Sequence, residues 1–135
     1  MENDTQNEST GFDLAEIQPQ ARTVDIVHPS TNYPIGLSIT ILPPSSPEVK
    51  RAQRKNLDAQ LSARSSKITA AGVEQNSLNL LVACVGAWEW KGDSNFKGNK
   101  PPCTPENVRE LFTEVSWIRE QVKDEFDDAE SFFDA

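Results

Sequence analysis

The chain has 135 residues, of which 36% are hydrophobic, and a formal net charge of −8. Its length fits one domain, and no stretch approaches the roughly 20 apolar residues that a membrane-spanning helix needs. Its first residues are acidic and polar, which argues against a secretory signal peptide, and its acidic total argues against nucleic acid as the main partner.

The two ends of the chain differ in composition from the part between them. Residues 1–20 hold five acids and no base, and they lack the apolar surface that offsets chain entropy, which predicts a disordered polar tail. Residues 128–135 are predicted to form an acidic C-terminal tail, so residues 21–127 remain as a single α+β domain. Residues 48–67 carry a net charge of +4 and residues 104–135 a net charge of −7. This separation suits internal pairing or a polar contact with another protein.

An N-terminal β-hairpin is predicted at about residues 22–42, where two β-rich runs flank a turn containing Pro, Asn and Gly. In the second run, Leu and Ile alternate with Ser38 and Thr40, which predicts one buried face and one solvent-facing face. Two prolines follow and end this strand, because proline cannot donate a ladder hydrogen bond.

Three or four helices are predicted to follow the hairpin. A Ser-Pro-Glu start predicts a helix over residues 47–62, and a run that is apolar on two faces predicts a central helix at about residues 69–87. A Thr-Pro-Glu start predicts another, and the apolar spacing predicts a separate last helix through Phe126, with Thr113 or Ser116 as its cap. The fold class is therefore α+β, with an N-terminal β-hairpin followed by a small bundle of three to four helices.

The expected core combines the apolar positions of these elements. Trp88 is expected to close the core at the end of the central helix. Trp90 cannot share its helical face, so the sequence leaves open whether Trp90 is buried or exposed. Residues 91–103 are predicted to form a surface loop. The predicted core consists of Val24, Ile26, Leu37, Ile39, Ile41, Leu57, Val73, Leu80, Leu81, Cys84, Val85, Trp88, Val108, Leu111, Trp117 and Ile118.

The sequence offers no set of residues that would run a reaction. Its one histidine, His28, has no nearby nucleophile or acid pattern, so a structural or exposed role is favoured. Cys84 and Cys103 are expected to be reduced thiols, and with one histidine they do not make a four-ligand zinc site without carboxylates. The glycines near residues 92–98 do not match a phosphate-binding loop. We therefore expect no enzymatic activity, no metal and no cofactor.

Four segments follow the predicted strand pair in a set order, at residues 46–55, 80–88, 103–111 and 117–122. In this order they resemble the tail assembly chaperones of long-tailed bacteriophages, and the likeness spans about residues 22–133. The resemblance implies a non-catalytic protein of the infected host's cytoplasm. Such a protein would coat the phage tape-measure protein, keep it soluble, recruit tail-tube subunits and be absent from the mature virion. The family has no catalytic residues to carry over.

Two other functions stay open at this point. One is a permanent minor tail or connector subunit of the virion, which would use the hairpin edge to add strands to a ring. The other is a small regulator that uses the basic helix to bind nucleic acid. The amount of the chain in purified particles separates the first from a chaperone, and a salt-titrated DNA-binding assay separates the second. Self-association is compatible with each of them.

The predicted binding surface combines the hairpin edge with Trp90 and with the apolar side of the last helix, near Phe112 and Trp117. Free strand edges and exposed aromatic residues both supply partner contacts. A competing site is the row of cations at positions i, i+1, i+4 and i+5 of the first helix, which would bind acidic segments or pair with the chain's own acidic C-terminus. These cations are Lys50, Arg51, Arg54 and Lys55.

Overall fold

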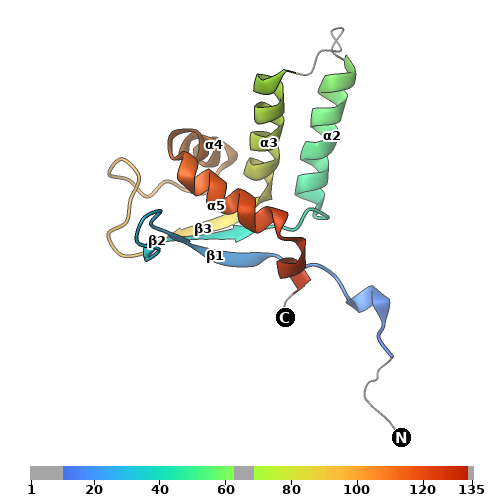
Figure 1. Cartoon of the computed structure of the whole chain (residues 1–135), viewed down its shortest axis with the longest axis horizontal. Helices are drawn as coiled ribbons and strands as arrows, with labels where there is room; N and C mark the ends of the chain where they lie inside the picture. Colours follow the sequence, from blue (N-terminus) through green and yellow to red (C-terminus); the bar gives the residue numbers. More distant parts are fainter. Residues whose placement is uncertain (1–10, 63–68, 134–135) are drawn as a thin grey trace, which may run out of the picture.

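A computed structural model describes residues 11–62 and 69–133. Half of the predicted N-terminal tail, residues 1–10, lies outside this part, as do residues 63–68 and the last two residues of the predicted C-terminal tail. Figure 1 shows a sheet with helices packed on one side and a pair of helices that stands away from it. The α+β class, with a hairpin followed by four α-helices, is confirmed.

The sheet has three antiparallel strands in the order β1-β2-β3. Strands β1 (Arg22–Val27) and β2 (Pro34–Ile41) form the predicted hairpin. Its turn is closed by a 2.8 Å hydrogen bond from the His28 N–H to the Tyr33 carbonyl. The third strand, β3 (Val85–Trp90), pairs with the other side of β2 and was not predicted.

Strand β3 occupies the segment that the sequence assigned to the end of the central helix. That helix, α3 (Ala70–Cys84), ends at Cys84, and the chain continues directly into the strand. Glycine and β-branched residues disfavour a helix interior, and the segment after Cys84 begins with Val85 and Gly86. A strand also places residues two apart on one face, so Trp88 and Trp90 both lie opposite apolar residues of β2.

The predicted alternation of apolar and polar side chains between the two faces of β2 is confirmed, but the polar face is not fully solvent-facing, since Ser38 is 4% exposed. Leu37, Ile39 and Ile41 are at most 1% exposed and face the helices. On the opposite face, the Ser38 hydroxyl donates a 2.6 Å hydrogen bond to the carboxylate of Asp25 in β1. The sheet therefore has one apolar face, which the helices cover, and one polar face.

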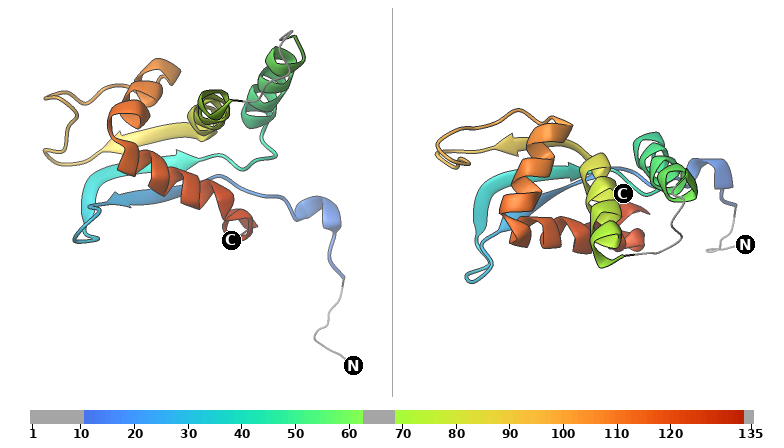
Figure 2. Two further views of the ribbon diagram at one scale, coloured as in Figure 1. Left: turned by 45° about the horizontal axis from the view of Figure 1, so that its top comes forward. Right: turned by 90° about the horizontal axis from the view of Figure 1, so that it is seen from above.

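Three further helices complete the domain: α2 (Pro47–Ser62), α4 (Pro105–Glu114) and α5 (Ser116–Asp127). The predicted start of α4 is confirmed, since the Thr104 hydroxyl accepts the Asn107 N–H at 3.2 Å. The predicted cap of α5 is wrong, because this helix begins without a side-chain cap. In Figure 2, α3, α4 and α5 lie over the sheet, while α2 stands beside α3. No helix in the described ranges is long and apolar enough to cross a membrane.

Most of the predicted core is buried or packed against the buried cluster. Two assignments are wrong, because Leu57 is 53% exposed and Val73 is 54% exposed. Both lie where α2 and α3 extend beyond the sheet, so no layer covers them. The buried hydrophobic residues are Ile26, Leu37, Ile39, Ile41, Val49, Leu81, Val82, Cys84, Val108, Leu111, Phe112, Ile118, Val122, Phe126 and Phe132.

The predicted C-terminal tail is partly wrong. Its residues Ala129–Phe133 form a short 3-10 helix, η2, in which Phe132 is 1% exposed and Phe133 is 53% exposed. The Phe132 carbonyl accepts the Gln20 N–H at 2.7 Å, which ties this segment to the chain just before β1. The acidic side chains of the segment suggested a solvated tail, but the free energy gained by burying the Phe132 side chain is enough to hold the segment against the domain. A second 3-10 helix, η1 (Leu14–Glu16), has no buried residue.

Candidate partner-binding surface

The structure does not form the surface predicted from Trp90, Phe112 and Trp117. Phe112 is 0% exposed, because α4 turns its apolar face toward the sheet and the neighbouring helices, so a contact role for this residue is wrong. Trp117 lies beside β1, whereas Trp90 lies in β3, at the opposite edge of the sheet. The three side chains therefore share no face that a partner would cover.

Trp90 is partly buried and packs against Trp88, with ring centroids 5.7 Å apart in an edge-to-face arrangement. The Trp88 indole N–H donates a 2.9 Å hydrogen bond to the Pro101 carbonyl. The Trp90 indole N–H is buried and meets no acceptor among the described residues. The two rings thus belong to the packing under the loop that follows β3, and they do not form an exposed anchor.

The edge of the sheet at β1 is closed at both ends. The Gln121 side chain of α5 accepts the Val27 N–H at 3.0 Å and donates to the Val27 carbonyl at 2.8 Å, as a neighbouring strand would. Arg22, at the other end of β1, forms an ion pair with Glu125. Such coverage protects an edge from strand addition. The edge at β3 differs, because residues 86–90 form no backbone hydrogen bond beyond the β2 ladder with any described residue.

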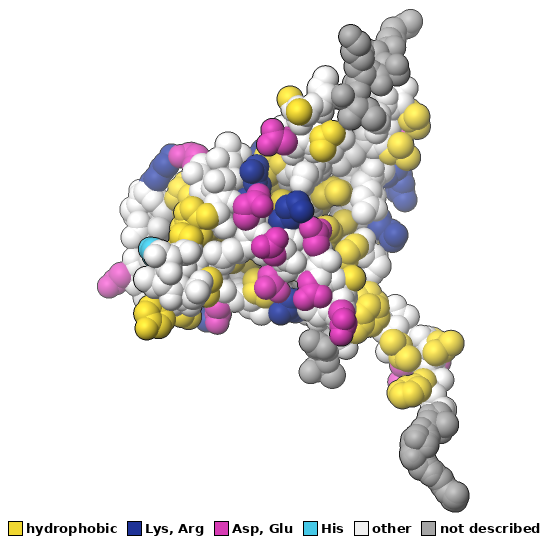
Figure 3. All heavy atoms as spheres, viewed as in Figure 1, with side chains coloured by type: hydrophobic (Ala, Val, Ile, Leu, Met, Phe, Trp, Pro, Cys, Tyr) yellow, Lys and Arg dark blue, Asp and Glu magenta, His cyan; other side chains and the backbone are white. Residues whose placement is uncertain are grey.

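A shallow groove of about 530 Å³ runs between β1 and α5. Its wall includes Trp117 and four carboxylates, and Figure 3 shows acidic side chains gathered over α5. Three of these carboxylates have a cation of this chain within 4 Å. The groove is thus acidic but partly neutralised from within. Its four acids are Asp25, Glu120, Asp124 and Glu125.

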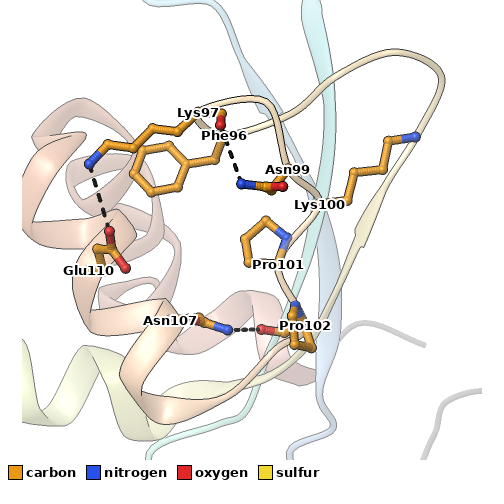
Figure 4. A pocket seen from close by; sticks show the side chains of 8 residues that line it. All are labelled: Phe96, Lys97, Asn99, Lys100, Pro101, Pro102, Asn107 and Glu110. Atoms are coloured by element: carbon orange, nitrogen blue, oxygen red, sulfur yellow. Dashed lines mark hydrogen bonds and ion pairs between the residues drawn. The ribbon is translucent and has the colours of Figure 1, made fainter.

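The predicted surface loop after β3, residues 91–103, projects as a finger with a tight turn (Figure 4). Phe96 and Asn99 exchange backbone hydrogen bonds of 2.8 and 3.1 Å around Lys97 and Gly98, whose φ angles are 56° and 81°. Positive φ at both central residues is typical of a tight hairpin turn. Gly98 suits its position, but lysine is uncommon at positive φ, so the Lys-Gly pair is not a sequence signal for the turn. Between this finger and α4 lies a pocket of about 480 Å³.

The charges at this pocket are paired rather than poised for proton transfer. Lys97 lies 2.7 Å from Glu114 and 3.7 Å from Glu110. The hydrogen bond to Glu114 raises the pKa of Lys97 and lowers the pKa of Glu114, so both stay ionised near neutral pH. A fixed ion pair of this kind supplies neither a general acid nor a general base.

Other reactive side chains have structural surroundings. His28 is exposed, and its Nδ1 accepts the Ser30 N–H at 3.1 Å, so the ring closes a turn. Burial raises the pKa of the Cys84 thiol to about 12, which keeps it protonated and unreactive. Burial also raises the pKa of Cys103. Within residues 11–62 and 69–133, no group of three or more His, Cys, Asp or Glu side chains is placed to hold a metal ion.

The helices α2 and α3 form a projecting pair, which we call the arm. Val49 anchors the base of α2 in the core and is 0% exposed. Above it, the Asn56 side chain donates to the Asn76 carbonyl at 3.2 Å and accepts from the Asn79 side chain at 3.0 Å. Arg109 of α4 in turn donates to Asn79 at 2.8 Å. The first two bonds join the two helices of the arm, and the third ties the arm to the body, as we call the sheet together with α4 and α5.

Beyond these contacts, the arm exposes apolar side chains. Leu57 and Leu61 of α2 are 53% and 74% exposed, and Val73 of α3 is 54% exposed. Figure 3 shows hydrophobic side chains near the tip of α2 and basic side chains below them on its outer edge. Large apolar side chains that gather on a projecting element mark an interaction surface more often than isolated ones do.

The four cations of α2 are all exposed, and none forms an ion pair with an acid in the described part of the chain. Two acids of the C-terminal region form ion pairs with other cations: Glu125 pairs with Arg22, and Asp127 pairs with Lys123 at 2.8 Å. Among residues 104–133, no acid forms an ion pair with the cations of α2. The cations are Lys50, Arg51, Arg54 and Lys55; Arg64 and Lys67 lie outside the described residues.

The arm thus combines exposed leucines with cations that no described acid neutralises, and it is the candidate partner-binding surface. Sequence reasoning identified the cations but placed Leu57 in the core. Comparisons with protein-family models, with curated proteins and with solved structures found no match.

Proposed function

We propose that this chain is a non-catalytic tail assembly chaperone of a long-tailed bacteriophage. In this proposal it binds the tape-measure protein in the cytoplasm of the infected host, helps to recruit tail-tube subunits and leaves before the virion is complete. The ordered segments that resemble this family motivate the proposal. The observation that carries it is the arm, whose leucines and cations are exposed and have no partner among the described residues.

The geometry suits a protein that holds another chain without committing to it permanently. The body buries its own apolar residues, so the fold does not depend on covering the arm. The exposed apolar surface at the arm is small, and small interfaces favour transient rather than obligate association. The net charge of −8 would also keep several copies bound along one partner from aggregating with each other.

A permanent minor tail or connector subunit is the second candidate function. The free edge of β3 favours it, because residues 86–90 have no backbone partner beyond β2 among the described residues. An exposed edge accepts a strand from another chain, and repeated strand addition builds rings. Under this function the chain would stay in the finished particle.

The test starts with capture of the tagged chain from infected cells and identification of its partners by mass. The tape-measure protein of the same phage is then expressed with and without this chain, and its soluble fraction is measured. We expect the chain to raise that fraction and to be missing from purified virions. An unchanged soluble fraction would contradict the chaperone function. Retention of the chain in virions at a fixed stoichiometry would favour the structural subunit.

A further inference from the structure

The outward side of α2 carries a row of residues with coiled-coil spacing. Lys50, Arg54, Leu57 and Leu61 follow one another at steps of four, three and four residues, and all are exposed. Steps that alternate in this way keep side chains on one seam of a helix that packs against another helix. We call these four residues the outer row.

The outer row is not the side of α2 that contacts α3. That contact uses the side of Val49 and Asn56, which are buried and partly buried. At 3.6 residues per turn, the outer row lies roughly 120° around the helix from that side. It therefore remains available after the arm has formed.

The cations of the outer row do not stabilise α2 itself. Lys50 lies close to the N-terminal end of the helix, where a positive charge opposes the helix dipole. No described acid pairs with Lys50 or Arg54. A negatively charged partner accounts for both positions, and the adjoining leucines require that partner to have an apolar part.

We propose that the outer row binds a single amphipathic helix of the partner protein, packed along α2 as in a two-stranded coiled coil. The partner helix would place apolar side chains at heptad spacing against Leu57 and Leu61 near the tip. It would place Asp or Glu, about one heptad away, against Lys50 and Arg54 near the base. This inference deepens the proposed function by naming the chemistry of the segment that the chaperone recognises.

Other occupants fit the outer row less well. Double-stranded DNA would engage the cations but would leave the leucines in water. The chain's own N-terminal segment is acidic and exposes Phe12, Leu14 and Ile17, but these residues do not follow heptad spacing. Both remain outcomes of the test below.

The probe is a synthetic amphipathic helix about three heptads long, with Leu at the a and d positions of one end and Glu at those of the other. Its affinity for the full-length chain is measured by fluorescence anisotropy. We expect Lys50→Glu with Arg54→Glu to weaken binding about tenfold or more, and Leu57→Ser with Leu61→Ser to do the same. The control is Lys55→Glu, compared with Arg54→Glu alone. It makes the same charge change at an outward b position and should change affinity by less than about threefold, whereas Arg51 flanks the row at an e position and is left unaltered. Circular dichroism confirms that each variant is folded.

A second peptide carries Lys in place of Glu and should bind the Lys50→Glu, Arg54→Glu variant better than the unaltered chain. Equal losses for the row and control variants, or full binding by the leucine variant, would overturn the proposal. Tighter binding of a DNA duplex than of the peptide would do so as well. So would peptide binding that appears only after residues 1–20 are removed, because those residues would then occupy the row.

The two proposals fail in different ways. Should the peptide bind as expected while the tape-measure protein does not bind at all, the proposed function is wrong and the outer row remains a helix-binding site. Should the tape-measure protein bind the row variants as well as the unaltered chain, the function stands and this inference is wrong.

Discussion

The two ends of α3 carry the same apolar periodicity, but they lie in different regions of the molecule: the lower end is packed in the body and the upper end projects in the arm. Its positions 73, 77, 80 and 84 follow one face at steps of four, three and four residues. Cys84, at the lower end, is 0% exposed, whereas Val73, at the upper end, is 54% exposed. The difference is that the sheet, α4 and α5 pack around the lower end only (Figure 1). Apolar periodicity thus indicates that a helix has an apolar side, and the extent of the neighbouring layers decides whether that side is covered.

The first prediction tests how far the packed body extends. We expect Phe132→Ala to lower the free energy of unfolding by about 3–5 kcal/mol, because it empties a fully enclosed site. Phe133→Ala is the matched control, and we expect it to cost less than about 1 kcal/mol, since that ring is 53% exposed. Chemical denaturation measures both. Similar small losses of unfolding free energy for the two variants would show that the C-terminal segment is a solvated tail.

The second prediction compares a leucine of the body with one of the arm. Leu81 is 3% exposed, so we expect Leu81→Ala to cost about 2–5 kcal/mol. Leu57 is 53% exposed, so we expect Leu57→Ala to change stability by less than about 0.5 kcal/mol. A cost above about 2 kcal/mol for Leu57→Ala would show that the arm tip is packed in solution and would remove the basis for treating it as a binding surface.

The boundary between the two regions also marks where sequence reasoning succeeded. The hairpin, the start of α4 and the alternation along β2 follow from local chemistry, such as β-branched runs and a Thr-Pro-Glu cap. The end of α3 does not, because the apolar residues continue without a proline through Trp88, and one glycine near a helix end is compatible with a helix. Val85 and Gly86 disfavour a helix only weakly, and the strand is completed by pairing with β2, which joins residues far apart in the sequence.

The candidate site was predictable in part for the same reason. Four cations within residues 50–55 of one helix are exposed in almost any fold, so the sequence was enough to identify them. Leu57 was assigned to the core because its exposure depends on how far α2 rises above the sheet. Phe112 was assigned to the surface because an amphipathic helix of ten residues does not reveal which neighbours cover it. Both errors concern the arrangement of layers rather than the identity of elements.

The third prediction concerns the polar atoms inside the body. Trp88 and Trp90 are both partly buried, but only the Trp88 indole N–H has an acceptor among the described residues. We expect Trp88→Phe to cost about 1 kcal/mol more than Trp90→Phe, because the first change removes a hydrogen bond and the second removes an unpaired buried donor. Urea denaturation of the two variants measures this difference. Equal costs would indicate that the Trp90 donor also has a partner in solution.

The smallest expected effect concerns a cation of the arm, where the sign of the change in stability is more informative than its size. Lys50 lies near the N-terminal end of α2 and pairs with no described acid, so we expect Lys50→Gln to leave stability unchanged or raise it by up to about 0.5 kcal/mol. Arg22 of the body pairs with Glu125, so Arg22→Gln should lower stability by up to about 1 kcal/mol. Both effects should shrink at high ionic strength, because salt screens charges at the surface. A clear loss of stability in Lys50→Gln would show that this cation serves the fold. It would then no longer be free for a partner, since a charge already neutralised within the chain adds little when an acidic helix arrives.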